Sequence, residues 1–162
     1  MNDCFFCKVQ HVPAHIVWEN EHLFFVLDDH PVSPGHGLLV PRRHVPSILD
    51  ANDTEWQAYK LALPLCIQAL DQLDMQVVYA DKLRSATSET MAWFCQRALS
   101  HQRLGTKPDG YNHGVNDGAA AGQTVDHLHW HIIPRYNGDM IDPRGGVRYV
   151  IPEMGNYKIP RA

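Results

Sequence analysis

Residues 116–135 have the sequence NDGAAAGQTVDHLHWHIIPR, with histidines at three alternating positions, His127, His129 and His131. Alternate side chains of a β-strand share one face, so the three imidazoles are expected to point the same way. The apolar residues between them, Leu128, Trp130 and Ile132, are expected to point into the core. The pattern predicts a strand over Val125–Pro134 that follows a glycine-rich loop over Asn116–Gly122.

The loop before the histidines has the composition of a phosphate-binding segment. Gly118 and Gly122 allow backbone N–H groups to approach an anion closely, and Gln123 and Thr124 add side-chain donors. A neutral histidine that faces a bound phosphate can attack phosphorus, and neighbouring imidazoles can orient it or protonate the leaving group. Two other interpretations of the histidine row stay open, a solvated strand face and three ligands around zinc.

Composition limits the class of protein. The 162 residues are 44% hydrophobic, which suits one domain with its own core. A formal net charge of −4 predicts no binding to a nucleic-acid polymer. The sequence has no apolar run of about 20 residues and no secretory leader at its start, so no membrane partner and a cytoplasmic location are expected.

The rest of the chain is expected to alternate strands and helices. Three strands are predicted before the first helix, over Ile16–Glu19, Leu23–Leu27 and Gly37–Pro41. A helix should begin at Asn52 or Asp53 and be kinked or split at Pro64. Residues 75–84 are ambiguous, and the remaining elements are a helix over Ser88–Gln102 and a strand over Gly110–Val115.

These segments together resemble the histidine triad (HIT) family, in which three histidines alternate with apolar residues after a Gly-Gln-Ser/Thr-Val step. Three further segments share the resemblance: Cys4–Cys7, Leu27-Asp28 and Pro34–His44. The resemblance implies an α+β fold, in which an antiparallel β-meander carries the triad strand and helices pack on one face. It also implies a single HIT domain over residues 1–162, with a C-terminal extension from about residue 136, and in most relatives a homodimer.

The resemblance also implies roles for individual residues. His129 would be the nucleophile, His131 a phosphate contact and acid, and His36 and His127 the residues that orient the row. The substrate-binding residues that it implies are Asp28 for the ribose, Asn116, Gly122, Gln123 and Thr124 for the phosphates, and Arg135. The aromatic residues expected in the base pocket are Phe5, Phe6 and Phe25. Two features depart from the family pattern: Asp29 follows the ribose aspartate, and residues 56–110 are longer than usual.

A structural zinc ion is predicted near the N-terminus. Cys4 and Cys7 form a C-x-x-C pair, which in a reducing compartment indicates metal before disulfide. Relatives with this pair imply that His44 and His127 complete a tetrahedral site. The alternative is that Cys4 and Cys7 are reduced thiols on a loose terminus. The two remaining cysteines, Cys66 and Cys95, are expected in the core.

The resemblance favours one reaction over its alternatives. Pro134-Arg135 followed by Gly138-Asp139 resembles the branch that cleaves dinucleoside polyphosphates such as diadenosine tetraphosphate. Hydrolysis through a nucleotidyl-histidine intermediate is therefore predicted, with Arg135 as a contact for the leaving nucleotide. Two interpretations stay open for the tail residues Arg144 and Arg148, a clamp for distal phosphates and a solvated charged loop. The alternatives are an adenosine phosphoramidase, a nucleotidyl transferase or phosphorylase, and a nucleotide-binding protein without catalysis.

Overall fold

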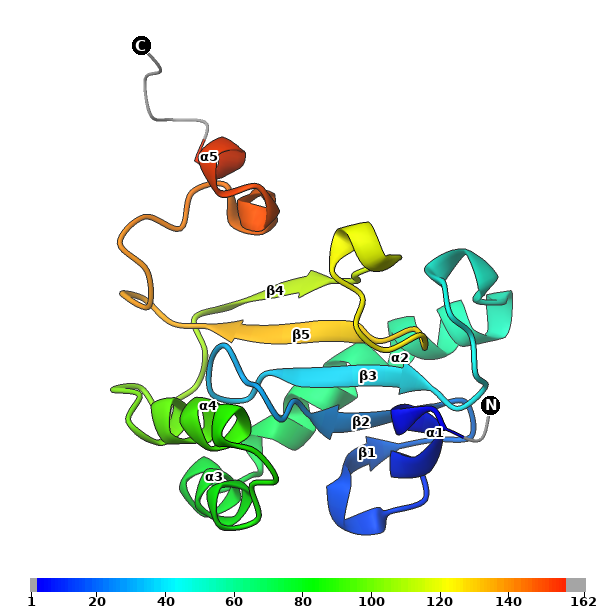
Figure 1. Ribbon diagram of the computed structural model, residues 1–162, viewed down its shortest axis with the longest axis horizontal. Helices are drawn as coiled ribbons and strands as arrows, with labels where there is room; N and C mark the ends of the chain where they lie inside the picture. The colour runs from blue at the N-terminus through cyan, green and yellow to red at the C-terminus, as the bar shows by residue number, and fades with distance from the viewer. Residues whose placement is uncertain (1–2, 157–162) are drawn as a thin grey trace.

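The computed structural model describes residues 3–156, and its centre is a five-stranded antiparallel sheet (Figure 1). The strands lie in the order β1-β2-β3-β5-β4. Their bounds are β1 Ile16–Glu19, β2 Leu23–Leu27, β3 Gly37–Pro41, β4 Gly110–Gly114 and β5 Trp130–Arg135. The first three strands form the meander predicted from the sequence, and the sheet with its helices confirms the predicted α+β class.

Five helices accompany the sheet in the described part of the chain. They are α1 Phe5–Val9, α2 Asp53–Asp71, α3 Met75–Arg84, α4 Glu89–Leu99 and α5 Pro152–Gly155. In Figure 1, α2 runs behind the sheet, α3 and α4 lie at the end where β2 and β5 finish, and α1 lies in front. None of these helices is long and apolar enough to cross a membrane.

The start of α2 agrees with the sequence prediction, and its middle is continuous. The Asn52 side chain accepts a hydrogen bond from the Glu55 N–H, and the Glu55 carboxylate accepts one from the Asn52 N–H, which forms a capping box. A kink or a split was predicted at Pro64; the split is wrong, because α2 is continuous through this residue, and the kink stays a prediction. Pro64 is exposed, so the carbonyl that loses its N–H partner, that of Lys60, can hydrogen-bond with water.

Strand β2 is buried on both sides, and its alternating residues divide the core in two. Leu23, Phe25 and Leu27 pack in one cluster with residues from α2, α3 and α4. Phe24 and Val26 pack in the other cluster, beneath α1. All five residues of β2 are therefore buried, which places the strand in the middle of the molecule.

The triad strand is shorter than predicted. β5 begins at Trp130 instead of Val125, and its pairing with β3 ends at Leu39 opposite Trp130. Two residues further along the ladder is Pro41, which has no N–H to donate to the partner strand. The backbone before β5 bonds elsewhere, since Leu128 N–H donates to the Val45 carbonyl. Trp130 and Ile132 are buried, as expected for residues between the histidines.

The chain after β5 covers the residues for which a C-terminal extension was predicted. Residues 136–156 contain a short 3-10 turn over Gly146–Val150 and the helix α5, which pack against each other. The expected extension continues to residue 162, and its last six residues lie outside the described part of the chain. Whether residues 136–162 form a separate extension of a single domain stays a prediction.

Close packing around β2 predicts a large effect of one methyl group. A Cβ atom at Gly37 would lie 2.2 Å from Cζ of the fully buried Phe25 ring. Gly37→Ala is expected to lower the free energy of unfolding by about 1–3 kcal/mol, because the ring must shift within a close-packed core. Gly114→Ala is the matched control, since its Cβ would meet nothing within 4 Å. Urea unfolding should separate the two variants, and equal losses would contradict the packing explanation.

Candidate active site

A cavity of about 460 Å³ opens between the N-terminal segment, β2 and the residues around β5, and its volume suits a nucleotide. Its apolar side is formed by Phe5, Phe6, Val9, Val26 and Leu38. Its polar side includes Asp28, Asn116, Thr124, His129 and His131. Seven of these ten residues were singled out from the sequence. Phe25 does not line the cavity, because it packs in the core on the opposite face of the sheet.

His129 borders the cavity with one defined tautomer. The side chain is only 6% exposed, and its Nδ1 lies 2.7 Å from the carbonyl oxygen of His127. A carbonyl oxygen can only accept a hydrogen bond, so Nδ1 carries the proton and Nε2 keeps a lone pair. Phe6 and His131 lie beside the imidazole, each with its ring centroid 5.1 Å away. In the neutral ring, the lone pair of His129 is therefore on Nε2.

A chain of hydrogen bonds also fixes the tautomer of His131. The Val32 N–H donates to Nδ1 of His36 at 3.4 Å, which leaves the His36 proton on Nε2. That nitrogen is 2.9 Å from Nδ1 of His131, so the His131 proton is on its own Nε2. Within residues 3–156 this buried Nε2 has no hydrogen-bond partner. A buried donor left unpaired at a cavity is a place where a ligand oxygen can bind.

Burial keeps these histidines uncharged at neutral pH. Desolvation, together with the smaller effects of the neighbouring His36 and His129, lowers the pKa of His131 to about 4. Burial also lowers the pKa of His36, although the Asp28 carboxylate, 3.6 Å away, acts in the opposite direction. We take His36 as neutral because it is 3% exposed and desolvation is the larger effect. The site therefore offers lone pairs and N–H groups in place of positive charge.

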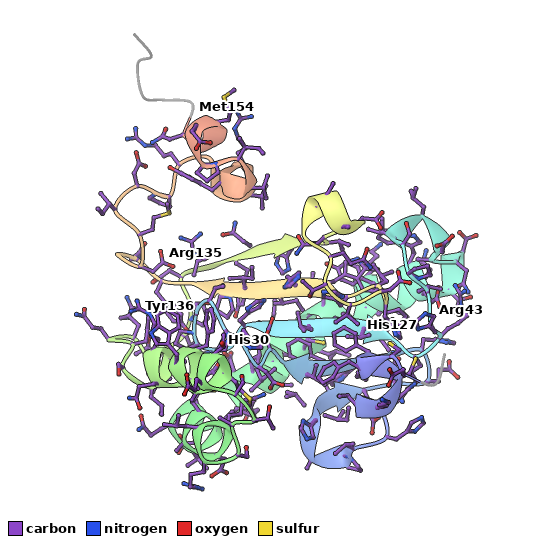
Figure 2. The ribbon with its side chains drawn as sticks, viewed as in Figure 1. His30, Arg43, His127, Arg135, Tyr136 and Met154 are labelled. Atoms are coloured by element: carbon purple, nitrogen blue, oxygen red, sulfur yellow. The ribbon has the colours of Figure 1, made fainter. Side chains whose placement is uncertain are left out.

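His127 points away from the cavity and toward the two N-terminal cysteines. Its Nε2 donates to the Pro41 carbonyl at 2.8 Å, so Nδ1 has the lone pair. That Nδ1 lies 3.4 Å from Sγ of Cys4 and 3.7 Å from Sγ of Cys7. The third contact joins Cys7 Sγ to Nδ1 of His44 at 3.4 Å. Figure 2 shows His127 close to sulfur atoms.

The donor set of this Cys/His cluster fits a tetrahedral metal ion. The four ligand atoms all lie within 4.8 Å of one another. Zinc bonds of about 2.0 Å to nitrogen and 2.3 Å to sulfur would separate neighbouring ligand atoms by about 3.5 Å, close to the spacings found. Burial and the neighbouring Cys4 raise the pKa of the Cys7 thiol, so a thiolate there needs a nearby cation. The structure thus brings together the four residues that the sequence analysis grouped.

Two of the loop residues expected to bind phosphate do not line the cavity. The N–H groups of Gly122 and Gln123 donate to carbonyls inside the loop, those of Ala119 and Gly118. The Gln123 side chain accepts from the Gly118 N–H at 2.7 Å and donates to the Pro46 carbonyl at 2.7 Å. Gly118 and Gly122 both have positive φ, which the tight turn requires. Gln123 therefore shapes the loop, while Asn116 and Thr124 border the cavity.

The arginines expected to clamp distal phosphates are engaged elsewhere. Arg135 binds Asp139 through two hydrogen bonds of 2.7 and 2.8 Å and donates to Asn112 at 2.6 Å. Arg144 pairs with Asp142, and Arg148 donates to carbonyls of α5. Arg135 lies at the end of β5 away from His127 in Figure 2. None of the three lines the cavity.

One wall of the cavity was missed in the sequence analysis. Thr87, Ser88 and Met91, at the junction of α3 and α4, line it together with His15 and His30. Residues 75–84 gave no clear periodic pattern, although Asp74 and Ser88 are typical helix N-caps. The caps were the available signal for the α3–α4 hairpin, and nothing in the sequence indicated that it reaches the nucleotide-sized cavity.

The fold and the site define a histidine triad protein, with three histidines at alternating positions beside a nucleotide-sized cavity. Residues 9–138 match the HIT domain family. An uncharacterized HIT-like protein of Methanocaldococcus jannaschii is 31% identical over 84% of this chain and 81% of its own length. The chain therefore belongs to the HIT family, a family of nucleotide-binding hydrolases and transferases.

Two relatives have names that describe an activity. The adenylylsulfatase HINT3 of Arabidopsis thaliana is 29% identical, and the AP-4-A phosphorylase of Mycobacterium tuberculosis is 30% identical. Each match covers 86% of this chain and 56% of the relative.

Solved structures share the fold. A HIT family member from Bacillus subtilis has a TM-score of 0.57 at 25% identity, over 99% of this chain and 82% of the other. A zinc-bound histidine triad family protein from Mycobacterium smegmatis has a TM-score of 0.52 at 27% identity, over 87% of this chain and 81% of the other.

The hydrogen-bond chain predicts the protonation state of His131. We expect its ring to stay neutral, with the proton on Nε2, from about pH 8 to about pH 5, because its pKa is about 4. An unfolded histidine takes up its proton near pH 6.5, so His131 should reduce stability as pH falls from about 6.5 toward 4. Two-bond ¹H–¹⁵N NMR correlations, assigned with His131→Gln, measure both properties. Protonation near pH 6.5, or a proton on Nδ1, would contradict the proposed chain.

Proposed function

We propose that this protein cleaves a phosphate bond of a nucleotide through a covalent nucleotidyl intermediate on Nε2 of His129. The observation that carries the proposal is the hydrogen bond from His129 Nδ1 to the His127 carbonyl. It places the lone pair on the other ring nitrogen, in a residue that borders a nucleotide-sized cavity. A protein that only binds nucleotides has no need for a nucleophile prepared in this way.

The proposed reaction has two steps. With the base among Phe5 and Phe6 and the ribose at Asp28, Nε2 of His129 attacks the phosphorus, and a P–N bond forms as the bond to the leaving group breaks. The His131 Nε2–H is the proposed donor to a substrate oxygen, because it is the unpaired donor at the cavity. Water then attacks the same phosphorus, the P–N bond breaks, and His129 is regenerated as the nucleotide leaves.

Dinucleoside polyphosphates such as diadenosine tetraphosphate are the proposed substrates. The relative named as an AP-4-A phosphorylase supports this substrate class, although the match spans 56% of that protein. We leave Arg135 out of the proposed binding residues, because its guanidinium is held by Asp139 and Asn112. Asn116 and Thr124 stay in the set because they line the cavity.

A second function, cleavage of a nucleotide with a small leaving group, has its own support. No lysine or arginine among residues 3–156 lines the cavity, so the structure offers no fixed cation for distal phosphates. The relative named as an adenylylsulfatase is 29% identical to this chain. Adenosine phosphoramidate is the simplest substrate of this second class.

Product analysis separates these functions. We expect the kcat/KM for diadenosine tetraphosphate to exceed that for adenosine phosphoramidate, because a long polyphosphate leaves as a stabilised anion. Chromatography should show AMP and ATP in equal amounts, whether or not inorganic phosphate is present. ADP and ATP formed in phosphate buffer would identify a phosphorylase instead. A preference for the phosphoramidate would favour the second function, with His129 as nucleophile in both.

The nucleophile itself is tested by substitution. His129→Ala should lower kcat by at least about a thousandfold, because the covalent step is lost, while the Kd for AMP changes little. Intact-mass spectrometry after rapid quenching should find a nucleotidyl adduct on the wild type and none on the variant. Lys60→Ala on the exposed side of α2 is the matched control for turnover. Comparable turnover by His129→Ala would rule out the proposed intermediate.

We also propose that Cys4, Cys7, His44 and His127 hold a structural zinc ion. The support is the cluster geometry and the zinc-bound family member from Mycobacterium smegmatis. The ion would tie the N-terminal helix α1 to the residue whose carbonyl orients His129.

Zinc removal should therefore affect both stability and activity. Purified protein is expected to contain about one zinc ion per chain, and Cys4→Ser with Cys7→Ser should remove it and lower Tm. Cys66→Ala with Cys95→Ala is the control for zinc content, because these two thiols lie in the core and outside the cluster. Elemental analysis and thermal unfolding in chelator measure the effects. If the purified protein contains no zinc and chelator does not change its Tm, the zinc proposal is wrong. Cys4 and Cys7 would then be ordinary reduced thiols.

A homodimer stays part of the proposal. Leu61 and Leu65 are exposed on α2, and β4 is an edge strand of the sheet. The exposed leucines of α2 and the edge strand β4, which the turn over Gly146–Val150 contacts, are the surfaces that we propose for pairing with a second copy.

A further inference from the structure

Two side chains of the proposed site, Asp28 and His36, belong to one short loop. Asp28 begins the segment 28–36, which joins β2 to β3, and His36 ends it. The flanking residues Leu27 and Gly37 pair with each other in the sheet, so the backbone is held in place at both ends of the segment. The Asp28 N–H also donates to the His36 carbonyl at 3.0 Å, so the two residues are joined directly, and the direction of their side chains depends on what holds the residues next to them.

The Asp28 end is held by a lysine of α3. Lys82 Nζ donates to the Leu27 carbonyl at 3.2 Å and forms an ion pair with Asp29. The Lys82 side chain is 18% exposed, so this contact is partly shielded from water. Lys82 therefore binds the residue before Asp28 and the residue after it. The Asp28 carboxylate is oriented further by the His30 N–H, which donates to Oδ1 at 2.8 Å and leaves Oδ2 nearer His36.

The His36 end is held by a tyrosine of the same helix. Tyr79 is fully buried, and its hydroxyl accepts a hydrogen bond of 2.7 Å from the Gly35 N–H. Gly35 has a φ of +84°, and it directly precedes His36. A Cβ at this glycine would lie 3.1 Å from Pro134, so the turn is also tightly packed. Tyr79 thus sets the backbone from which the His36 side chain projects.

Tyr79 and Lys82 are three residues apart on α3, so they lie on the same face of the helix. We infer that α3 is a positioning helix for the nucleotide site, in which Lys82 places Asp28 and Tyr79 places His36. The inference rests on the proposed function for the roles of Asp28 toward ribose and of His36 toward His131. The inference gives a function to α3, which belongs to the long segment between α2 and β4. This segment is distant in sequence from the three histidines.

The Lys82 half is tested by ribose discrimination in binding. Isothermal titration of the wild type should find AMP bound about tenfold more tightly than 2′,3′-dideoxy-AMP, because the dideoxy compound lacks both hydroxyls. Lys82→Met should reduce this ratio to about threefold or less, mainly because AMP binds less tightly. Lys82→Arg keeps the cation and should restore the ratio. Arg84→Met is the matched control, since Arg84 is on the same helix and pairs only with exposed Asp81 among its ion pairs.

The Tyr79 half is tested by a separation of kcat from KM. Tyr79→Phe leaves the buried Gly35 N–H without its acceptor, so His36 should move relative to His131. We expect kcat to fall about tenfold, with KM changed less than about threefold. Tyr59→Phe, a tyrosine of α2 stacked on Trp130, is the control that should leave both constants near the wild-type values.

The outcomes are separable from those of the proposed function. If Lys82→Met does not fold, Asp29→Asn breaks the same ion pair from the other side and should lower the ribose ratio. Retention of the full ratio by the folded Lys82 variant, while Asp28→Asn loses it, would overturn the role of Lys82. Unchanged kcat in Tyr79→Phe would overturn the role of Tyr79. A wild type that binds both nucleotides equally would instead overturn the ribose role of Asp28 in the proposed function, and the Lys82 inference with it.

Discussion

The hydrogen bond between His129 Nδ1 and the His127 carbonyl links the proposed nucleophile to the Cys/His cluster. It fixes which ring nitrogen of His129 has the lone pair, and it makes that choice depend on where His127 lies. His127 is fully buried, and its own ring is fixed by the Pro41 carbonyl and directed at Cys4 and Cys7. The Cys/His cluster and the proposed nucleophile His129 are therefore joined through the carbonyl of His127. A metal in that cluster would act on catalysis through position, without touching the substrate.

Neutrality is the second condition that the site meets. A protonated imidazole has no lone pair for attack, so a nucleophilic histidine beside other histidines requires that its neighbours stay uncharged. Burial achieves this, because removal from water disfavours the charged form of His36 and His131. Asp28 opposes the effect at His36, and its distance of 3.6 Å keeps its influence smaller than that of burial. The segment 28–36 must then be held firmly, which gives the contacts from α3 their importance.

Local patterns predicted the meander and the residues of the histidine row, and non-local contacts account for what they missed. β2 and β3 were found at their observed bounds because each is a short apolar run between turn residues. The strand before Trp130 was predicted too long, since the effect of Pro41 on its partner strand depends on a register that sequence alone does not give. Arg135 has a side chain suited to binding phosphate, but its guanidinium is already paired with Asp139, four residues later in the chain. Tyr79 and Lys82 carry no motif, and only the packing of α3 reveals their contacts.

The electrostatics of the cavity bear on the kind of substrate it can process. Two carboxylates, Asp28 and Asp29, line it, Asp29 is paired with Lys82, and none of the described lining residues is a lysine or arginine. In the proposed reaction, phosphate would be bound by neutral donors such as the His131 N–H and the side chains of Asn116 and Thr124. Neutral donors suit the single phosphate under attack, because a hydrogen bond stabilises negative charge on the one oxygen that it contacts. A cation would also attract the more distant phosphates. The remaining phosphates of a long substrate would extend toward the open side of the cavity, where water solvates their charge. Discrimination between long and short substrates would then depend on the leaving group more than on binding, which is why measured rates separate the two proposed functions better than affinities do.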